Sequence, residues 1–457
     1  QFYPDNVLGI ITDLTEAIKN NKLLDIKNYL TQLAKTSFFK SKKPTPFDEA
    51  VSLIWYLENV FYHSFGNTYN YIKENIFDNR DFNNNLMSIG FWPGGDRDGN
   101  PFVTPEITLQ VAQRLKKTIV KNYYKDIREL KRRLTFKGVE EKINAIQDKL
   151  YLVIFEKDKD YIFSSENLIN DLLEIKQLIV KEHQSLYVNL VDSLLNKVKL
   201  FGSHFATMDI RQDSRVHNNV FNELVKSSIK NNLGFFPVDY FKLCESEQVQ
   251  ILSNIDGNID LSYFSNNLVL NTLRTIKVIK EIQSQNGEKA ANRYIISNNK
   301  TALNVMQLFA MLKLVAFNDD LSIDICPLFE TIEDLENAYD VMEVLYKNPS
   351  YLKHLKNRKL KQNIMLGFSD GTKDGGYLMA NWAIYKAKQR LTSISRDYKI
   401  DVIFFDGRGG PPARGGGKTH KFYASLGPSI ESKEVQLTVQ GQTISSNFGT
   451  LDSSKYN

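Results

Sequence analysis

The sequence is poor in cysteine and lacks any long apolar run. Only two cysteines, Cys244 and Cys326, occur in 457 residues. Two isolated thiols exclude a small disulfide-bonded secreted fold and favour a reducing compartment, so we expect a cytoplasmic protein. No apolar stretch approaches the ~18 residues that a membrane span needs, and no signal-peptide pattern is present. We therefore expect no membrane partner.

The sequence also lacks clustered charge and clustered histidine. Its 58 basic and 53 acidic residues leave a net charge of +5, too small for this length to indicate a nucleic-acid partner. The basic run 131–133 lies in an alternating-charge pattern and is interpreted as a solvated helix face. The six histidines show no metal-ligand spacing. The run 417–419 is not a nucleotide P-loop, because Pro412 stands where that motif needs glycine.

Residues 1–200 have a mostly helical pattern. Thr45 and Thr104 each precede a proline, which is the signature of an N-cap followed by the first helical position. The pattern predicts a helix from Thr104 to about residue 134 and one long helix over roughly 167–197. We therefore expect an amino-terminal helical region.

Residues 201–457 alternate short apolar runs with helical stretches. Six runs are predicted to be strands: 204–210, 293–297, 322–327, 363–367, 401–405 and 435–439. The intervening helices are predicted at 301–316, 332–347 and 375–396, and a polar helical insertion at 215–290. Strands alternating with helices imply a parallel sheet, and the lack of a dinucleotide fingerprint favours a partial (β/α)8 TIM-like barrel with added helices.

Carboxylates follow two consecutive predicted strands. Glu330 and Asp370 come where these strands end, and neighbouring strands lie about 5 Å apart, so both side chains can ligate one ion. Two carboxylates with water and substrate oxygens suit Mg²⁺ or Mn²⁺. Alternatively, one of them pairs with Arg211 or Lys373. Lys373 can neutralise the negative charge that develops on a transferred group, or it can pair with Asp374.

A glycine-rich run, 405–420, follows the apolar segment 400–404. It holds Arg408 and Arg414 among residues of little bulk, and Arg211 follows an earlier predicted strand. Glycine lets the backbone approach a ligand, and the arginine fork suits phosphate and carboxylate. These arginines therefore predict a site for a small, doubly anionic molecule. The alternative is ion pairing with nearby carboxylates: Asp209, Asp213 and Asp406.

A second glycine-rich loop, 90–101, contains Asp96 and Arg97. Its glycines, its proline and its alternating charges predict a rigid, hydrogen-bonded turn. The two charged residues either buttress a site or pin the helix that starts at Thr104, and the loop alone favours pinning.

Six motifs occur in an order that resembles one family. They are 94–101, 208–214, 327–332, 365–370 with 373–374, 407–410 with 414–417, and 438–441. Each is weak to moderate alone, but six in order are highly specific. The chain resembles the phosphoenolpyruvate carboxylases.

The resemblance implies an enzyme with an α/β barrel wrapped in helices. It implies a carboxy-lyase that joins phosphoenolpyruvate and bicarbonate through carboxyphosphate and pyruvate enolate, giving oxaloacetate and phosphate, with Mg²⁺ or Mn²⁺ as cofactor, in a homotetramer. Carried over by motif, Glu330 and Asp370 would hold the metal, while Arg211 and Arg408 would bind the substrate phosphate. Arg414 would lie beside bicarbonate and the leaving phosphate. Lys373 would lie near the metal and the substrate.

The sequence departs from the family pattern in three places. Asp406 stands where the family has histidine, so that either Asp406 pairs with an arginine or local catalysis differs. The segment 411–413 is proline-rich and predicts a stiffer loop. The family is about twice as long and has an amino-terminal catalytic-histidine segment and a carboxy-terminal part that this sequence lacks. We therefore expect an interior fragment that is inactive alone, with a non-catalytic binding or assembly relative as the alternative.

Overall fold

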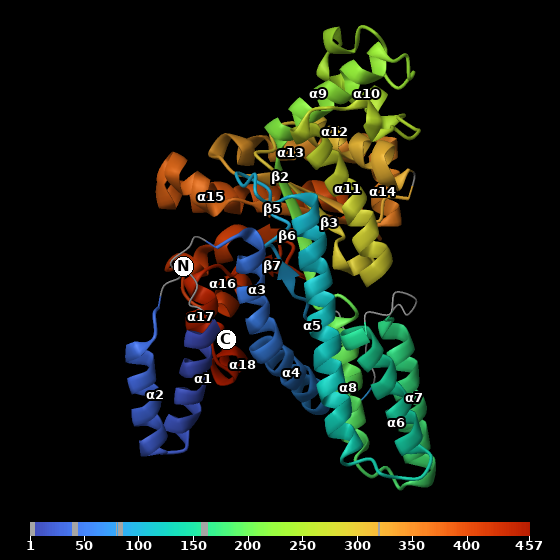
Figure 1. The fold of residues 1–457 in the computed structure, drawn as a ribbon. Helices are drawn as coiled ribbons and strands as arrows, with labels where there is room; N and C mark the ends of the chain where they lie inside the picture. The colour runs from blue at the N-terminus through green and yellow to red at the C-terminus, as the bar shows by residue number, and fades with distance from the viewer. Residues whose placement is uncertain (1–4, 39–43, 79, 81–85, 157–162, 319) are drawn as a thin grey trace.

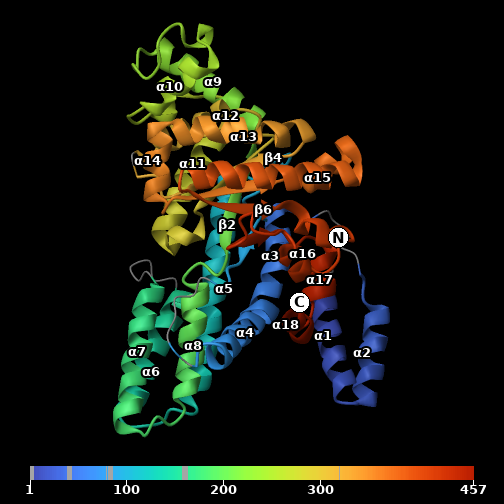
Figure 2. The ribbon, with the colours of Figure 1, turned by 180° about the vertical axis from the view of Figure 1, so that it is seen from behind.

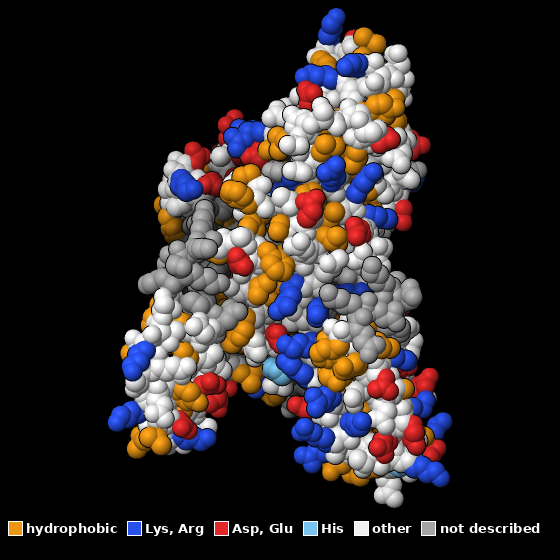
Figure 3. Space-filling view, in the orientation of Figure 1, with side chains coloured by type: hydrophobic (Ala, Val, Ile, Leu, Met, Phe, Trp, Pro, Cys, Tyr) orange, Lys and Arg blue, Asp and Glu red, His pale blue; other side chains and the backbone are white. Residues whose placement is uncertain are grey.

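The computed structural model describes residues 5–38, 44–78, 80, 86–156, 163–318 and 320–457. A curled sheet occupies the centre, and two helical legs extend from it on the same side (Figure 1). The space-filling view shows that the legs are separated at their far ends (Figure 3). None of the described helices combines the length and apolar character that crossing a membrane requires.

Seven parallel strands form the sheet in the order of the chain. They are β1 (Gly90–Phe91), β2 (Thr207–Asp213), β3 (Arg293–Ser297), β4 (Asp324–Phe329), β5 (Lys361–Leu366), β6 (Asp401–Asp406) and β7 (Val435–Leu437). Sequential order, parallel pairing and curl make this a half-barrel. The predicted partial α/β barrel is thereby confirmed.

The strands from β2 to β6 are largely buried on both faces, and their two faces enter different cores. Met365 and Phe405 belong to a small cluster on the inner side of the sheet, whereas their neighbours Ile364 and Phe404 join the large core under the helices. This alternation follows from the two-residue period of a strand. Near-continuous apolar runs are typical of parallel strands that are covered on both sides. Cys326, also in the inner cluster, is fully buried, and burial raises the pKa of its thiol to about 12.

Helices follow the strands and cover the outer face. These helices are α9 (Ser214–Lys230), α12 (Ala302–Leu312), α13 (Ile332–Lys347), α14 (Pro349–Asn357), α15 (Phe368–Asp397) and α16 (Thr419–Ala424). The segment between β2 and β3 also contains α10 (Glu245–Ser253) and α11 (Asn267–Asn286). The far end of α9 and α10 project from the sheet on the side opposite the legs (Figure 2). The segment between β2 and β3 is thus helical, while its assignment as an insertion at 215–290 stays a prediction.

The legs are built from the chain ends and from the first 200 residues. One leg contains α1 (Asp5–Lys19) and α2 (Leu23–Lys35), beside α17 (Gln442–Phe448) and α18 (Leu451–Tyr456). The other contains α5 (Pro105–Lys131), α6 (Val139–Tyr151), α7 (Ser165–Glu182) and α8 (Val188–Phe201). Helices α3 (Pro46–Tyr56) and α4 (Tyr62–Asn75) lie between them. The predicted domain boundary at residue 200 stays a prediction. Strand β1 shows that residues before position 200 also contribute to the sheet.

Both predicted N-caps are confirmed. The Thr45 hydroxyl accepts a hydrogen bond from the backbone of Asp48 in a capping box, and Thr104 accepts one from Ile107. Each such cap contributes about 1 kcal/mol, because it satisfies an otherwise unpaired N–H group at the helix start.

Several boundaries differ from the sequence-based expectation. Strand β2 lies three residues later than the predicted 204–210, so Arg211 falls within the strand and not after it. The single helix predicted over 167–197 is wrong, because α7 ends at Glu182 and α8 begins at Val188, with the backbone in the left-handed region at Gln184, Ser185 and Tyr187. Helix α15 starts seven residues before the predicted 375, and Gly376, with φ 78°, kinks it. Strand β1 was not predicted, since two residues are too few to show a pattern.

Candidate functional site

The carboxyl ends of all seven strands meet at one edge of the half-barrel, because every strand pair is parallel. Arg211 lies near the end of β2, Glu330 follows β4, and Asp406 ends β6. Asp370 lies in the first turn of α15, directly after β5. The topology therefore brings to one edge the residues that the sequence analysis placed at strand ends.

Arg211 is held by the loop that follows β1. Its Nε and Nη2 each donate to a different carboxylate oxygen of Asp96 at 2.8 Å, and Asp98 lies 3.7 Å from Nη2. The Arg211 guanidinium also lies 4.8 Å from the ring centre of Trp92. A planar fork bound by two parallel hydrogen bonds has a fixed direction, so Arg211 is oriented in advance. Asp96 thus holds Arg211, which favours the buttressing interpretation over pinning of a helix, and this role stays a prediction.

The other carboxylates that Arg211 was expected to contact have different partners. Asp209 is buried and lies 3.2 Å from Arg293, and it accepts a hydrogen bond from the Trp92 indole at 2.9 Å. Asp213 pairs with Arg215 at 2.6 Å and caps α9. Neither Asp209 nor Asp213 is therefore the ion-pair partner of Arg211.

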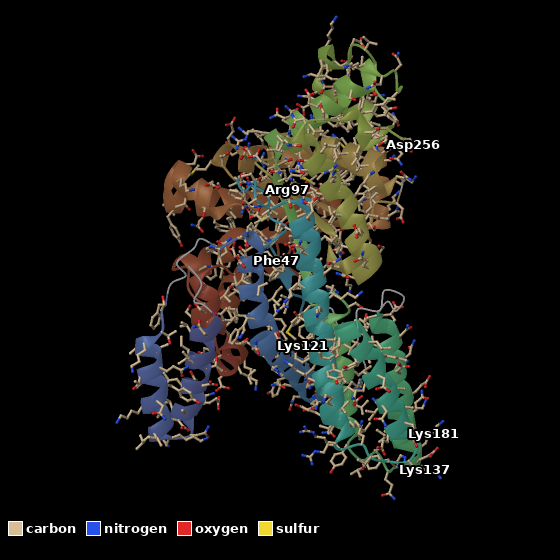
Figure 4. The ribbon with its side chains drawn as sticks, in the orientation of Figure 1. Phe47, Arg97, Lys121, Lys137, Lys181 and Asp256 are labelled. Carbon is tan, nitrogen blue, oxygen red and sulfur yellow. The ribbon has the colours of Figure 1, made fainter. Side chains whose placement is uncertain are left out.

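Arg97 points away from Arg211. Its backbone N–H donates to the Arg211 carbonyl at 2.9 Å, while its guanidinium donates to Asn271 and Thr275 of α11. Figure 4 labels Arg97 where the upper end of α5 meets the sheet region. The helix starting after Thr104 is instead tied to the loop by Thr108, whose hydroxyl donates to the Gly94 carbonyl at 2.6 Å.

Glu330 is a half-buried carboxylate between β3 and β5. One of its oxygens accepts a hydrogen bond from the Asn298 backbone at 2.9 Å. Gly367 packs on it so closely that an added Cβ would lie 3.1 Å from Cα and from Cγ of Glu330. Burial, together with the charges of Asp370 and Asp98, raises the pKa of Glu330 to about 7. This carboxyl therefore holds a proton more tightly than usual, as one expects where negative charge accumulates.

Asp370 and Lys373 form an exposed ion pair at 2.8 Å on the first turn of α15. Asp374 instead accepts a hydrogen bond from the Ile332 backbone at 3.2 Å, so Lys373 does not pair with it. Within the described ranges, no group of three or more His, Cys, Asp or Glu residues forms a metal cage. Glu330 and Asp370 are two mutually repelling carboxylates, and such a pair fits a Mg²⁺ or Mn²⁺ ion that keeps water and substrate oxygens as its other ligands.

Asp406 pairs with a lysine rather than with an arginine. Its oxygens lie 2.8 and 2.9 Å from Nζ of Lys388 on α15, and the Tyr423 hydroxyl donates to it at 2.6 Å. Burial and the Asp406 charge raise the pKa of Tyr423. The sequence analysis missed Lys388 and Tyr423, although Lys388 falls on the buried face of the helical pattern.

Arg408 and Arg414 lie in two short turns that follow β6, Gly407–Gly409 and Pro411–Arg414. Gly409 and Gly410 have φ values of 69° and 61°, which explains why this turn requires glycine. The side chains of both arginines lie outside the part of the structure that is described. Their roles stay predictions.

Comparison with known proteins identifies the family. The family model for phosphoenolpyruvate carboxylase matches residues 10–151 and 137–457. The phosphoenolpyruvate carboxylase of Nitrosomonas europaea is 28% identical over 491 residues, and that of Nitrosomonas eutropha is 28% identical over 486. Each alignment covers 96% of this chain and 52% of the relative, so the chain spans about half the length of these relatives. The chain belongs to the phosphoenolpyruvate carboxylase family.

Proposed function

We propose that the full-length protein carboxylates phosphoenolpyruvate with bicarbonate, giving oxaloacetate and phosphate, and that this chain supplies part of its site. The observation that carries the proposal is the Asp96–Arg211 pair, which holds a guanidinium near enough to Glu330 for its charge to act on that carboxyl. Phosphoryl transfer needs positioning and charge neutralisation more than covalent help from the protein. A fixed arginine beside two carboxylates that suit a divalent cation supports that chemistry.

Each residue has a proposed role. Arg211 and Arg408 bind the substrate phosphate, and Arg414 lies by bicarbonate and the leaving phosphate. Glu330 and Asp370 hold Mg²⁺ or Mn²⁺, which would neutralise negative charge that develops on the enolate. Lys373 is paired with Asp370 and adds positive charge near the same place.

The negative charge of Asp406 does not contradict this proposal. An aspartate facing an anionic substrate would repel it, but Lys388 and Tyr423 bind this carboxylate in a buried position. The ion pair is neutral overall, so its long-range effect on an anion is small.

Steady-state formation of oxaloacetate by the full-length protein tests the proposal. We expect activity that requires Mg²⁺ or Mn²⁺ and that falls at least a hundredfold in Asp370→Ala. Asp340→Ala, at a partly exposed position on α13, is the matched control and is expected to leave the rate unchanged. A full-length protein that is folded, binds phosphoenolpyruvate and makes no oxaloacetate would favour the non-catalytic alternative. Cytoplasmic location and a homotetramer are further parts of the proposal.

A further inference from the structure

A cavity of about 500 Å³ lies behind the loop that follows β1, and its wall includes Arg97. The wall is formed by this loop, by the end of β2 with the start of α9, and by α11. Arg97 and Asp96 are consecutive in an extended segment, so their side chains point to opposite sides of it. Asp96 faces Arg211, and Arg97 faces this cavity. The cavity therefore adjoins the end of β2 and lies on the other side of this loop from the Asp96–Arg211 pair.

Arg97 is an incompletely paired cation. Its side chain is 8% exposed, and its Nε has no hydrogen-bond acceptor among the described residues. Its guanidinium donates to a neutral carbonyl, that of Asn271, and to the Thr275 hydroxyl. No ion pair found in the described part of the chain involves Arg97, and Glu106 acts on it through its charge without a hydrogen bond. A buried cation in that position gains strongly from an anionic partner.

The acidic residues in the wall form no ion pair with Arg97 among the described residues, and each contacts a different arginine. Asp98 lies 3.7 Å from Arg211, and Asp213 lies 2.6 Å from Arg215. The positive charge that remains in the wall is that of Arg97. Amide side chains complete the polar lining: Asn100, Gln212, Asn219 and Asn271.

We propose that this cavity binds a small oxyanion, the carboxylate or phosphate group of a metabolite-sized molecule, with Arg97 as its principal ligand. The guanidinium suits both groups, and the amides supply hydrogen bonds to the rest of the molecule. Because the same loop carries Asp98, which contacts Arg211, occupation of the cavity is coupled to the orientation of Arg211. The proposal holds whether or not the strand-end edge catalyses carboxylation.

Calorimetric titration of the 457-residue chain tests this proposal, with inorganic phosphate in one arm and succinate in the other. We expect Arg97→Gln to weaken binding of the preferred anion at least tenfold. Asn219→Asp adds a negative charge at an exposed wall position without touching the core, and we expect it to weaken binding at least threefold. Arg114→Gln, at an exposed position on α5, is the matched control and leaves the affinity unchanged.

The variants distinguish the cavity from the strand-end edge, and the two titrations distinguish phosphate from carboxylate. The arm with the tighter binding identifies the group, phosphate or carboxylate. Binding that is lost in Arg211→Gln but unchanged in both cavity variants would place the anion at the strand-end edge and overturn the proposal. Absence of binding in both arms would overturn it as well. Binding that is weakened in Asn219→Asp and unchanged in Arg211→Gln would support the cavity site and count against the proposed role of Arg211.

Discussion

Lys388 of α15 and Asp406 at the end of β6 form a buried ion pair, with Nζ 2.8 Å from Oδ1. The two side chains are 3% and 1% exposed, and Asp406 directly precedes the turn that carries Arg408. The pair therefore connects the outer helix to the glycine-rich turn.

Loss of one partner from this pair is expected to destabilise the fold strongly. Lys388→Met should lower the free energy of unfolding by about 3–5 kcal/mol, because it leaves a buried charge without compensation. Adding Asp406→Asn, which still accepts the Tyr423 hydrogen bond, should recover part of the loss. Urea denaturation measures both. Lys386→Met, at an exposed position on the same helix, should cost under about 1 kcal/mol. A double variant no more stable than Lys388→Met would contradict this account.

Glu330 gives the metal-free chain a pH-dependent stability. Its pKa in the folded chain is about 7, above the ~4.3 expected when unfolded, so between these values the folded state binds more protons. The contribution of Glu330 to the free energy of unfolding is therefore largest below pH ~4.3 and falls as the pH rises to about 7. Melting in EDTA at pH 5 to 8 should show a steeper decline for wild type than for Glu330→Gln. Parallel profiles would refute the prediction.

Replacement of Gly367 by a residue with a side chain is expected to lower the free energy of unfolding. Gly367→Ala places a Cβ 3.1 Å from Cα and Cγ of Glu330, and overpacking of this kind costs about 1–3 kcal/mol. Gly9→Ala is the matched control, since it lies within α1 with open space around its Cβ and should stabilise by about 0.5–1 kcal/mol. Thermal denaturation of both variants distinguishes a steric effect from a general effect of replacing glycine.

The Asp96–Arg211 pair should control substrate affinity. Asp96→Asn keeps the shape of the side chain but removes the charge that orients the guanidinium. We expect phosphoenolpyruvate binding, followed by ³¹P line broadening, to weaken at least tenfold. Asp256→Asn, in the segment between α10 and α11, should leave binding unchanged. Equal affinities for wild type and Asp96→Asn would mean that Arg211 does not bind substrate.

Local sequence signals predicted much of the fold. Helix α13 and strand β3 have their predicted bounds, because a capping threonine and a continuous apolar run mark them clearly. The helix break at 183–187 carries no glycine or proline, so only the backbone angles at Gln184, Ser185 and Tyr187 reveal it. Strand β1 is defined by its pairing with β2 and not by its own two residues.

The sequence named candidate site residues, whose roles stay predictions, but it did not indicate their contact partners. Arg211 and Asp96 are 115 positions apart, and Lys388 reaches Asp406 only because α15 packs on β6. Such pairs depend on tertiary packing, and no single-sequence pattern encodes them. The carboxylates were located because the end of a parallel strand fixes where a side chain emerges.

The central claim is that Glu330, Asp370 and Arg211 share one site for a divalent cation and phosphoenolpyruvate. Crystals of the full-length protein grown with Mn²⁺ and phosphoenolpyruvate test it directly through the anomalous scattering of manganese. The account predicts one strong peak within coordination distance of both carboxylates, with the substrate phosphate on Arg211. A peak elsewhere, with Glu330 and Asp370 free of the metal, would contradict it.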